Sequence, residues 1–256
     1  MTNNQQSTTI YRTLECRPDS YQAWYQQGNA MREWRRYEEA LISYEKALEY
    51  YPNDYWAWYW RGIILEELGD YEEAIDSYAQ ASEVEPNNYW AWYERGCIYL
   101  EELGEYKQAI ACFEKALAVH ANDYWAEYRQ GEAWRLLGEY EKAIAYFDSA
   151  LKSRPNDYWA WYRRGDSLRD WGQLELALAS YCKALDVKPR DYWAWYQRGV
   201  ILQQLGRLSE AIECYHQALI AEPEDECAWY DQACCYALLG NIEGAINSLE
   251  QAINPG

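Results

Sequence analysis

The stretch NDYWAWYWRG at residues 53–62 decides the fold, because it returns along the chain in nearly the same form. Copies that begin at residues 87, 122, 156 and 190 read NNYWAWYERG, NDYWAEYRQG, NDYWAWYRRG and RDYWAWYQRG. The glycines that end these segments, together with Gly28 before them, follow one another at 34 residues, with a single step of 35. A fixed step of this length predicts a solenoid, in which stacked units share one apolar core.

Each unit is expected to form two helices. In the second unit, Asp54 is a good N-cap for a helix that begins at Tyr55, and Gly69 suits the left-handed residue that ends it. Apolar residues at helical spacing predict a second helix from about Tyr71, which ends before Pro86.

A glycine also lies inside the first helix of six units. Gly62 there costs roughly 1 kcal/mol of helix stability compared with alanine, so its return calls for a packing reason. We expect the second helix to cross closely at this point, with Ala74 and Ala81 as its small partners.

The unit resembles the tetratricopeptide repeat in residue type and spacing. The matching positions of the second unit are Trp58, Gly62, Leu65, Ala74, Tyr78, Ala81 and Pro86. The resemblance covers residues 21–254 in seven units that start near 21, 55, 89, 124, 158, 192 and 226. It implies an all-α fold, a right-handed superhelical α-solenoid of antiparallel helix pairs that occupies residues 21–256.

Some positions depart from this pattern. Glu127 replaces the Trp58-type tryptophan, and arginines such as Arg61 and Arg164 stand where the family usually has leucine. We expect these arginines to lay their methylene groups along the edge of the core and to send the guanidinium to solvent or to a neighbouring carboxylate.

Both ends of the array are weaker. Residues 10–20 align with residues 78–88, so residues 1–20 are expected to form a disordered start followed by a capping half-repeat. At the other end no extra solvating helix follows the seventh unit. Three interpretations stay open: residues 242–253 act as a poor cap, another protein or a second copy covers this end, or a downstream segment is missing.

The clustered rings divide between two faces of the first helix. Because an α-helix turns about 100° per residue, Trp58, Gly62 and Leu65 share the stripe that faces the second helix. Trp56 lies about 160° away around the axis, and Tyr59 falls on its side. The family resemblance implies that the face of Trp56 and Tyr59 lines the concave surface of the superhelix.

Equivalent rings in five units form the predicted binding ladder. It consists of Trp56, Tyr59, Trp90, Tyr93, Trp125, Tyr128, Trp159, Tyr162, Trp193 and Tyr196. Next to it lie residues of varied character, among which we select Glu132, Arg135, Asp166 and Arg169 as ligand contacts. A uniform aromatic floor with varied neighbours suits a sequence-selective groove. The alternative for the tyrosines is that they only pack between helices. For the tryptophans there are two alternatives: recent duplication copied them without selection for a ligand, or neighbouring rings stack and merely stiffen the array.

The expected ligand is an extended peptide. Proline-rich segments lie flat on Trp and Tyr, and Lys or Arg makes cation–π contacts with them. The sequence thus predicts a non-enzymatic protein-interaction scaffold, or adaptor, for a proline-rich or basic peptide. The alternatives are a structural array that self-associates, a regulatory sensor module of a larger protein, and a glycan-binding groove.

Composition limits the partners and the chemistry. The chain has 23 basic and 42 acidic residues, a net charge of −19, which argues against nucleic acids and anionic membranes as partners. Without an apolar segment at its start, the chain is expected to be cytoplasmic, with its eight cysteines as free thiols. His120 and His216 lie in different units without acid–base or metal-binding partners at useful spacing, so we predict no catalysis, cofactor or metal.

Overall fold

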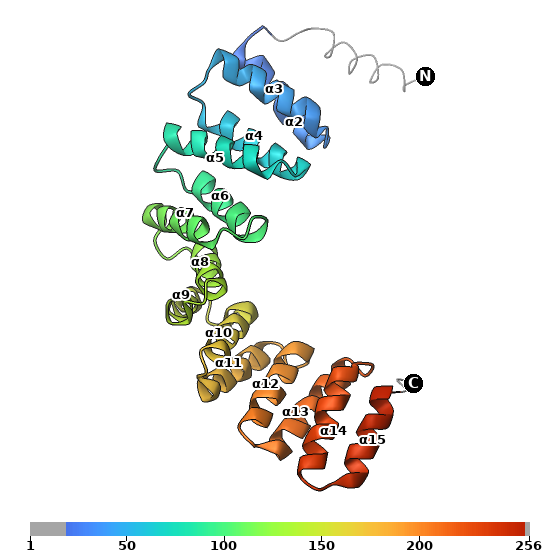
Figure 1. Ribbon diagram of the computed structural model, residues 1–256. Helices are drawn as coiled ribbons and strands as arrows, with labels where there is room; N and C mark the ends of the chain where they lie inside the picture. Colours follow the sequence, from blue (N-terminus) through green and yellow to red (C-terminus); the bar gives the residue numbers. More distant parts are fainter. Residues whose placement is uncertain (1–18, 254–256) are drawn as a thin grey trace, which may run out of the picture. The chain divides into compact units, whose positions relative to one another are not determined.

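The computed structural model describes residues 19–253, and all regular elements in this range are α-helices of 12 to 14 residues (Figure 1). They are α2 (Tyr21–Glu33), α3 (Tyr37–Tyr50), α4 (Tyr55–Leu68), α5 (Tyr71–Val84), α6 (Tyr89–Glu101), α7 (Tyr106–Val119), α8 (Tyr124–Leu136), α9 (Tyr140–Ser153), α10 (Tyr158–Asp170), α11 (Leu174–Val187), α12 (Tyr192–Gln204), α13 (Leu208–Ala221), α14 (Glu226–Leu238) and α15 (Ile242–Ile253). The half-repeat expected before residue 19 lies outside the described residues. The predicted all-α array of antiparallel helix pairs is confirmed.

The helices form two compact units, which divide between residues 119 and 120. The first unit holds the pairs α2/α3, α4/α5 and α6/α7, and the second holds α8/α9, α10/α11, α12/α13 and α14/α15. Inside each unit the two helices of a pair pack along their length, and the second helix of one pair also packs on the first helix of the next. The core is therefore continuous along each unit.

The ends of the first helices follow the expected signals. Asp54 and its counterparts cap them; the Asp157 carboxylate, for example, accepts the Ala160 N–H at 2.9 Å. Gly69 closes α4 in the left-handed region, with a φ of 85°. α5 has no side-chain cap, but it carries Glu72 and Glu73 in its first turn, where carboxylates interact favourably with the helix dipole.

The close approach at Gly62 is confirmed, but with a different partner. A Cβ atom on Gly62 would lie 2.6 Å from the Tyr78 ring, so the glycine makes room for this ring of α5. Gly96 makes room for Phe113 in the same way. Ala74 is fully buried in the surrounding core but is not the group that needs the space.

Trp58 faces the second helix, as predicted, but it lies at the edge of the core and not inside it. It is half-buried, packs against the cluster that contains Leu65 and Tyr78, and donates its indole N–H to the Pro52 carbonyl at 2.8 Å. In the fourth repeat the buried Glu127 takes this place and accepts a hydrogen bond from the Ser149 hydroxyl at 2.6 Å.

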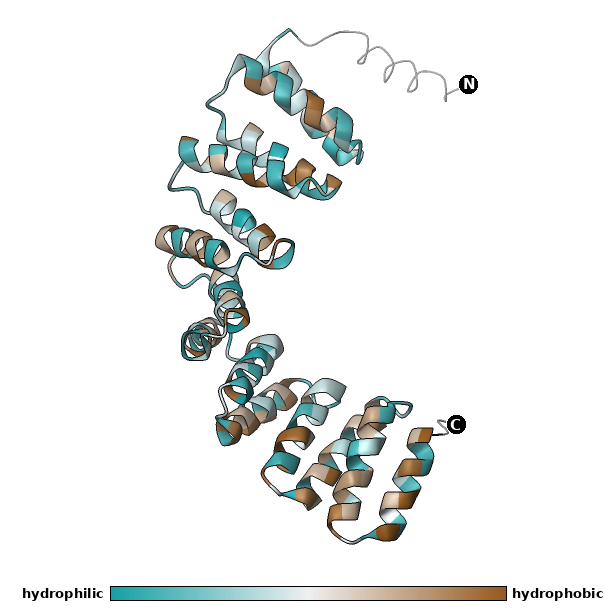
Figure 2. Cartoon of the chain, in the orientation of Figure 1, coloured by the Kyte–Doolittle hydropathy of each residue, from teal (hydrophilic) through white to brown (hydrophobic). Residues whose placement is uncertain are grey.

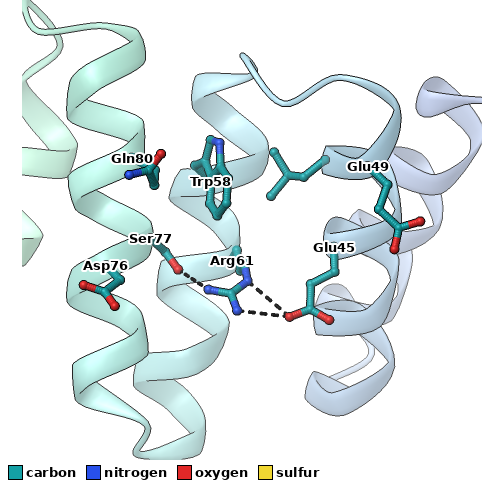
Figure 3. A pocket seen from close by; sticks show the side chains of 8 residues that line it. Glu45, Glu49, Trp58, Arg61, Asp76, Ser77 and Gln80 are labelled. Atoms are coloured by element: carbon teal, nitrogen blue, oxygen red, sulfur yellow. Dashed lines mark hydrogen bonds and ion pairs between the residues drawn. The ribbon is translucent and has the colours of Figure 1, made fainter.

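The arginines at the core edge behave as expected. Arg61 contacts Glu45 of the preceding second helix at 3.0 Å and donates to Ser77 of its own pair at 2.6 Å (Figure 3). Arg164 repeats this arrangement with Asp148 and Ser180. Each such arginine thus joins two neighbouring second helices.

Candidate functional site

The most regular exposed feature is a row of five indoles at the starts of the first helices. We call it the indole row; its members are Trp56 and Trp90 in the first unit and Trp125, Trp159 and Trp193 in the second. Their exposed fractions are 41%, 49%, 48%, 49% and 55%. The rings thus lie away from the core, on the side of the helix that the sequence indicates.

Each indole of the row is held by the tyrosine that precedes it. The ring of Trp56 stands edge-on to Tyr55 with centroids 5.0 Å apart, and Trp159 and Tyr158 repeat this geometry at 5.0 Å. The tyrosines of these pairs are buried. An anchored ring loses little conformational freedom when a ligand covers it, which favours binding.

Sequence reasoning missed the role of these preceding tyrosines. The Tyr158 hydroxyl donates to Asp191, the N-cap of the next first helix, at 2.5 Å. In the first unit, the Tyr55 hydroxyl accepts the Ala91 N–H of the next first helix at 3.1 Å. The recurrent Tyr–Trp pair in the sequence was the signal that could have indicated this role. The hydrogen-bond partners of the tyrosine hydroxyls, however, lie 33 to 36 residues away in the sequence.

The five tyrosines of the predicted ladder pack between helices, so they expose less surface than the indoles do, and their selection as ligand contacts stays a prediction. Tyr59 and Tyr162 are buried, and Tyr93, Tyr128 and Tyr196 are half-buried. The Tyr59 ring stacks on Tyr55 at 6.0 Å and contacts the Tyr78 ring at 5.8 Å. Burial raises the pKa of Tyr162 to about 12, so its phenol stays neutral at physiological pH. These rings pack between helices and leave little surface for a ligand.

The four charged residues selected from the sequence are brought together, but they bind one another. Glu132 pairs with Arg135 at 3.2 Å, and Asp166 is buried, 3.5 Å from Arg169. Arg163, which sequence reasoning missed, joins the two pairs: it lies 3.5 Å from Glu132 and 3.1 Å from Asp166.

This charge chain crosses three first helices of the second unit. Arg169 of α10 donates to Gln197 of α12 at 2.6 Å, while Arg163 of α10 reaches Glu132 of α8. The Tyr181 hydroxyl also donates to Asp166 at 2.7 Å. Because these charges are compensated and partly buried, they link successive first helices and offer few free charges to a ligand.

The first unit is more acidic at the corresponding positions. Glu66 accepts a hydrogen bond from the Tyr78 hydroxyl at 3.0 Å. Burial raises the pKa of the Glu66 carboxyl, and the negative charges of Glu67, Glu101 and Glu102 raise it further. Acidic side chains at the C-terminal ends of α4 and α6, the helices that carry Trp56 and Trp90, would favour a cationic ligand in this unit.

Two other hollows lie outside the indole row. One opens beside Trp58 and Arg61 between α3 and α5, with Glu45 and Asp76 on its sides (Figure 3). The other lies between α12, α14 and α15 and is lined by Tyr196, Tyr230 and Ile253, among others. Both are open and shallow, and neither gathers groups for catalysis.

The described residues also limit other chemistry. Among residues 19–253, no group of His, Cys, Asp and Glu side chains is arranged to hold a metal ion, and the seven cysteines of this range form no disulfide. Burial raises the pKa of the Cys112 thiol to about 11, which keeps it protonated and unreactive. None of the helices in this range has the length and apolar character needed to cross a membrane.

Comparison with family models decides the family. Models described as tetratricopeptide repeat match residues 21–54, 43–76, 93–158, 192–225 and 228–254, and a TPR repeat model matches 65–101 and 165–206. The chain is a tetratricopeptide repeat protein. Proteins of this family serve as protein-interaction scaffolds. A comparison with curated proteins gives no match.

Several solved structures share the fold of this tetratricopeptide repeat protein. YrrB, a TPR protein with an unusual peptide-binding site, is 24% identical, with a TM-score of 0.60 over 70% of this chain and 92% of its own. MamA from Desulfovibrio magneticus RS-1 is 23% identical, with a TM-score of 0.62 over 68% and 98%. PilW, a type IV pilus biogenesis factor, is 22% identical, with a TM-score of 0.64 over 87% and 100%. At these identities the likeness establishes the fold.

Proposed function

We propose that this tetratricopeptide repeat protein is a non-enzymatic scaffold that binds extended peptide segments of a partner along the part of the indole row that lies in each unit. The observation that carries the proposal is the exposure of five equivalent indoles, between 41% and 55%. An exposed indole ring contributes favourable hydrophobic free energy when a ligand covers it. A regular set of such rings suits a ligand with a repeating structure.

The stiffening interpretation of the indole row is less favoured. Contacts of Trp56 with Tyr55, Tyr59 and Trp60 all run within α4. Contacts between successive first helices come instead from buried tyrosine hydroxyls, such as that of Tyr158. Stiffening therefore has its own residues, and the indoles remain available.

Two classes of peptide fit the indole row. Proline rings can lie flat on indoles without loss of an internal hydrogen bond, because a polyproline helix has none. Basic side chains gain cation–π contacts and are attracted by a chain of net charge −19. YrrB, which has a peptide-binding site on the same fold, supports a peptide as the ligand. A glycan that stacks on the indoles is the alternative ligand.

The test is capture of peptides from an array that contains proline-rich, basic, mixed and neutral segments. The variant carries Trp90→Ala, Trp125→Ala and Trp159→Ala. The control carries Trp34→Ala and Trp171→Ala, since these indoles are 54% and 45% exposed but lie outside the row. We expect the row variant to lose at least about tenfold in affinity, with unchanged helical circular dichroism, and the control to bind like wild type. Equal binding by the row variant would overturn the proposal.

A second role, self-association, is favoured by the exposed apolar stripe of α15. Ile242, Ile246 and Ile253 are half or more exposed there. Figure 2 shows the apolar residues of α15 in brown. The equivalent Ile212 and Leu219 of α13 pack against the neighbouring core. Sedimentation equilibrium tests this role: the mass should rise with concentration and stay monomeric in an Ile246→Glu variant. A monomer at all concentrations would contradict it.

A further inference from the structure

In several repeats, the residue that directly follows the second helix lies beside the start of the first helix in the same repeat. We call this residue, which precedes the proline of the loop, the cap residue. Tyr51 caps α3, and its ring contacts Tyr21 at the start of α2, with centroids 5.7 Å apart. Arg154 caps α9, and its guanidinium lies 4.2 Å from the Tyr124 ring centroid at the start of α8. The geometry is thus shared by both units.

In two repeats the cap residue is a cation placed on the indole row. The Arg154 guanidinium is 5.0 Å from the centroid of the Trp125 ring. The Lys188 ammonium, at the end of α11, is 5.3 Å from the centroid of the Trp159 ring and 4.1 Å from that of Tyr158. Each of these indoles has a positive charge of the protein itself over or beside its ring.

In two other repeats the cap residue is an acid. Glu85 follows α5 and Glu222 follows α13, and both side chains are exposed. They occupy the same place after the second helix as Arg154 and Lys188 do in the other two repeats. In agreement with this place, the Glu85 carboxylate adds to the rise that burial causes in the pKa of Tyr55, and Glu222 acts in the same sense on the pKa of Tyr192, after burial and Asp225.

Cap residues change the electrostatics of a binding ring without changing its shape. An indole face attracts a cation, and a carboxylate beside it strengthens this attraction. A lysine or arginine already on the face repels a second cation and offers a partner to a carboxylate. Trp159 also has Arg163 at 6.0 Å from its ring centroid, but this guanidinium is paired with Glu132 and Asp166, so Lys188 is the uncompensated cation at this indole.

We infer that the cap residue sets the charge of the ligand side chain that each indole accepts. Trp56 and Trp193, with Glu85 and Glu222, take basic side chains of the bound segment. Trp125 and Trp159, with Arg154 and Lys188, take acidic ones. This inference rests on the proposed function and adds to it that the ligand carries both charges in a fixed order along the second unit, acidic against α8 and α10 and basic against α12.

Two peptides that differ only in charge test the inference on the full chain. They are the acetylated and amidated decapeptides (Arg-Pro)5 and (Glu-Pro)5. The readout is the shift of each indole N–H resonance in a titration, with resonances assigned from single Trp→Phe variants. In wild type, (Arg-Pro)5 should shift Trp56 and Trp193, and (Glu-Pro)5 should shift Trp125 and Trp159.

Charge reversal at the caps then identifies the cause. Glu222→Lys should weaken binding of (Arg-Pro)5 at Trp193 by about fivefold or more, and Lys188→Glu should do the same for (Glu-Pro)5 at Trp159. The matched control is Glu224→Lys, which makes the same change in net charge two residues from the cap; it should leave both affinities within about twofold. Circular dichroism monitors the fold of each variant.

The outcomes separate the inference from the proposed function. If both peptides shift the indole row but cap reversal leaves each affinity unchanged, the inference is wrong and the proposed function stands. If Glu224→Lys acts as strongly as Glu222→Lys, net charge rather than the cap is responsible, and the inference is again wrong. If neither peptide shifts any indole of the row, peptide binding itself is contradicted, and the inference with it.

Discussion

At the scale of single residues, the recurrent glycine in the first helix indicated where the two helices of a repeat approach closely. It did not indicate which side chain of the second helix lies against the glycine. A glycine equivalent to Gly62 is present in six repeats, and the geometry of an α-helix places it on the side that faces the second helix. The structure shows that the ring of Tyr78 occupies this space, whereas the sequence suggested the small residues Ala74 and Ala81. The reason is that a helix wheel gives the direction of a side chain but not its reach across to a neighbour.

Gly62→Ala tests this contact. Alanine is the better helix former by about 1 kcal/mol, but its Cβ would lie 2.6 Å from the Tyr78 ring. We expect overpacking to prevail and to lower the free energy of unfolding by about 1–3 kcal/mol, measured by urea denaturation. Glu67→Ala on the exposed side of the same helix is the control and should change it little. A Gly62→Ala variant more stable than wild type would contradict the packing account.

Glu66 predicts a pH-dependent effect. Burial raises the pKa of the Glu66 carboxyl above its value in the unfolded chain. The folded state therefore binds the carboxyl proton more tightly than the unfolded state does. Ionised Glu66 therefore lowers the stability of the fold at neutral pH, and this cost disappears as the pH falls through the folded pKa. Glu66→Gln should raise the melting temperature by a few degrees at most at about pH 7 and by nothing at about pH 4. Melting curves at the two pH values check this; a difference that grows toward acid would have the wrong sign.

At the scale of helices, local patterns were enough to predict the pairs, their caps and the outward direction of Trp56. Contacts between helices of successive repeats were not predictable in the same way. Asp191 was expected as an N-cap, but its bond to Tyr158 joins residues 33 positions apart. Glu132 and Asp166 were predicted to be ligand contacts, but in the structure Arg163 pairs with both of them. This pairing could not be predicted, because it depends on how α8 and α10 pack.

A double-mutant cycle measures this link between repeats. Asp191 accepts both the Ala194 N–H at 2.9 Å and the Tyr158 hydroxyl at 2.5 Å. We expect Asp191→Ala to cost about 2 kcal/mol and Tyr158→Phe about 1 kcal/mol of unfolding free energy. The double variant should cost less than the sum by about 0.5–1 kcal/mol. Strictly additive losses would show that the cap and the tyrosine act independently.

At the scale of the whole molecule, the repeats contain two sets of aromatic rings with different positions. Buried tyrosines hold successive first helices together, and exposed indoles repeat at the surface of both units. The family match places the chain among protein-interaction scaffolds. In the function that we propose, the net charge of −19 and the acidic residues of the first unit would favour basic segments.

The central claim is that the indole row contacts the ligand. The most direct measurement is ¹⁹F NMR of the chain labelled with 5-fluorotryptophan, with and without a saturating peptide obtained from the array. The account predicts that resonances of the indole row shift on binding in the repeats that the peptide contacts, while those of the equally exposed Trp34 and Trp171 stay in place. A bound peptide that leaves the row resonances unmoved would contradict it.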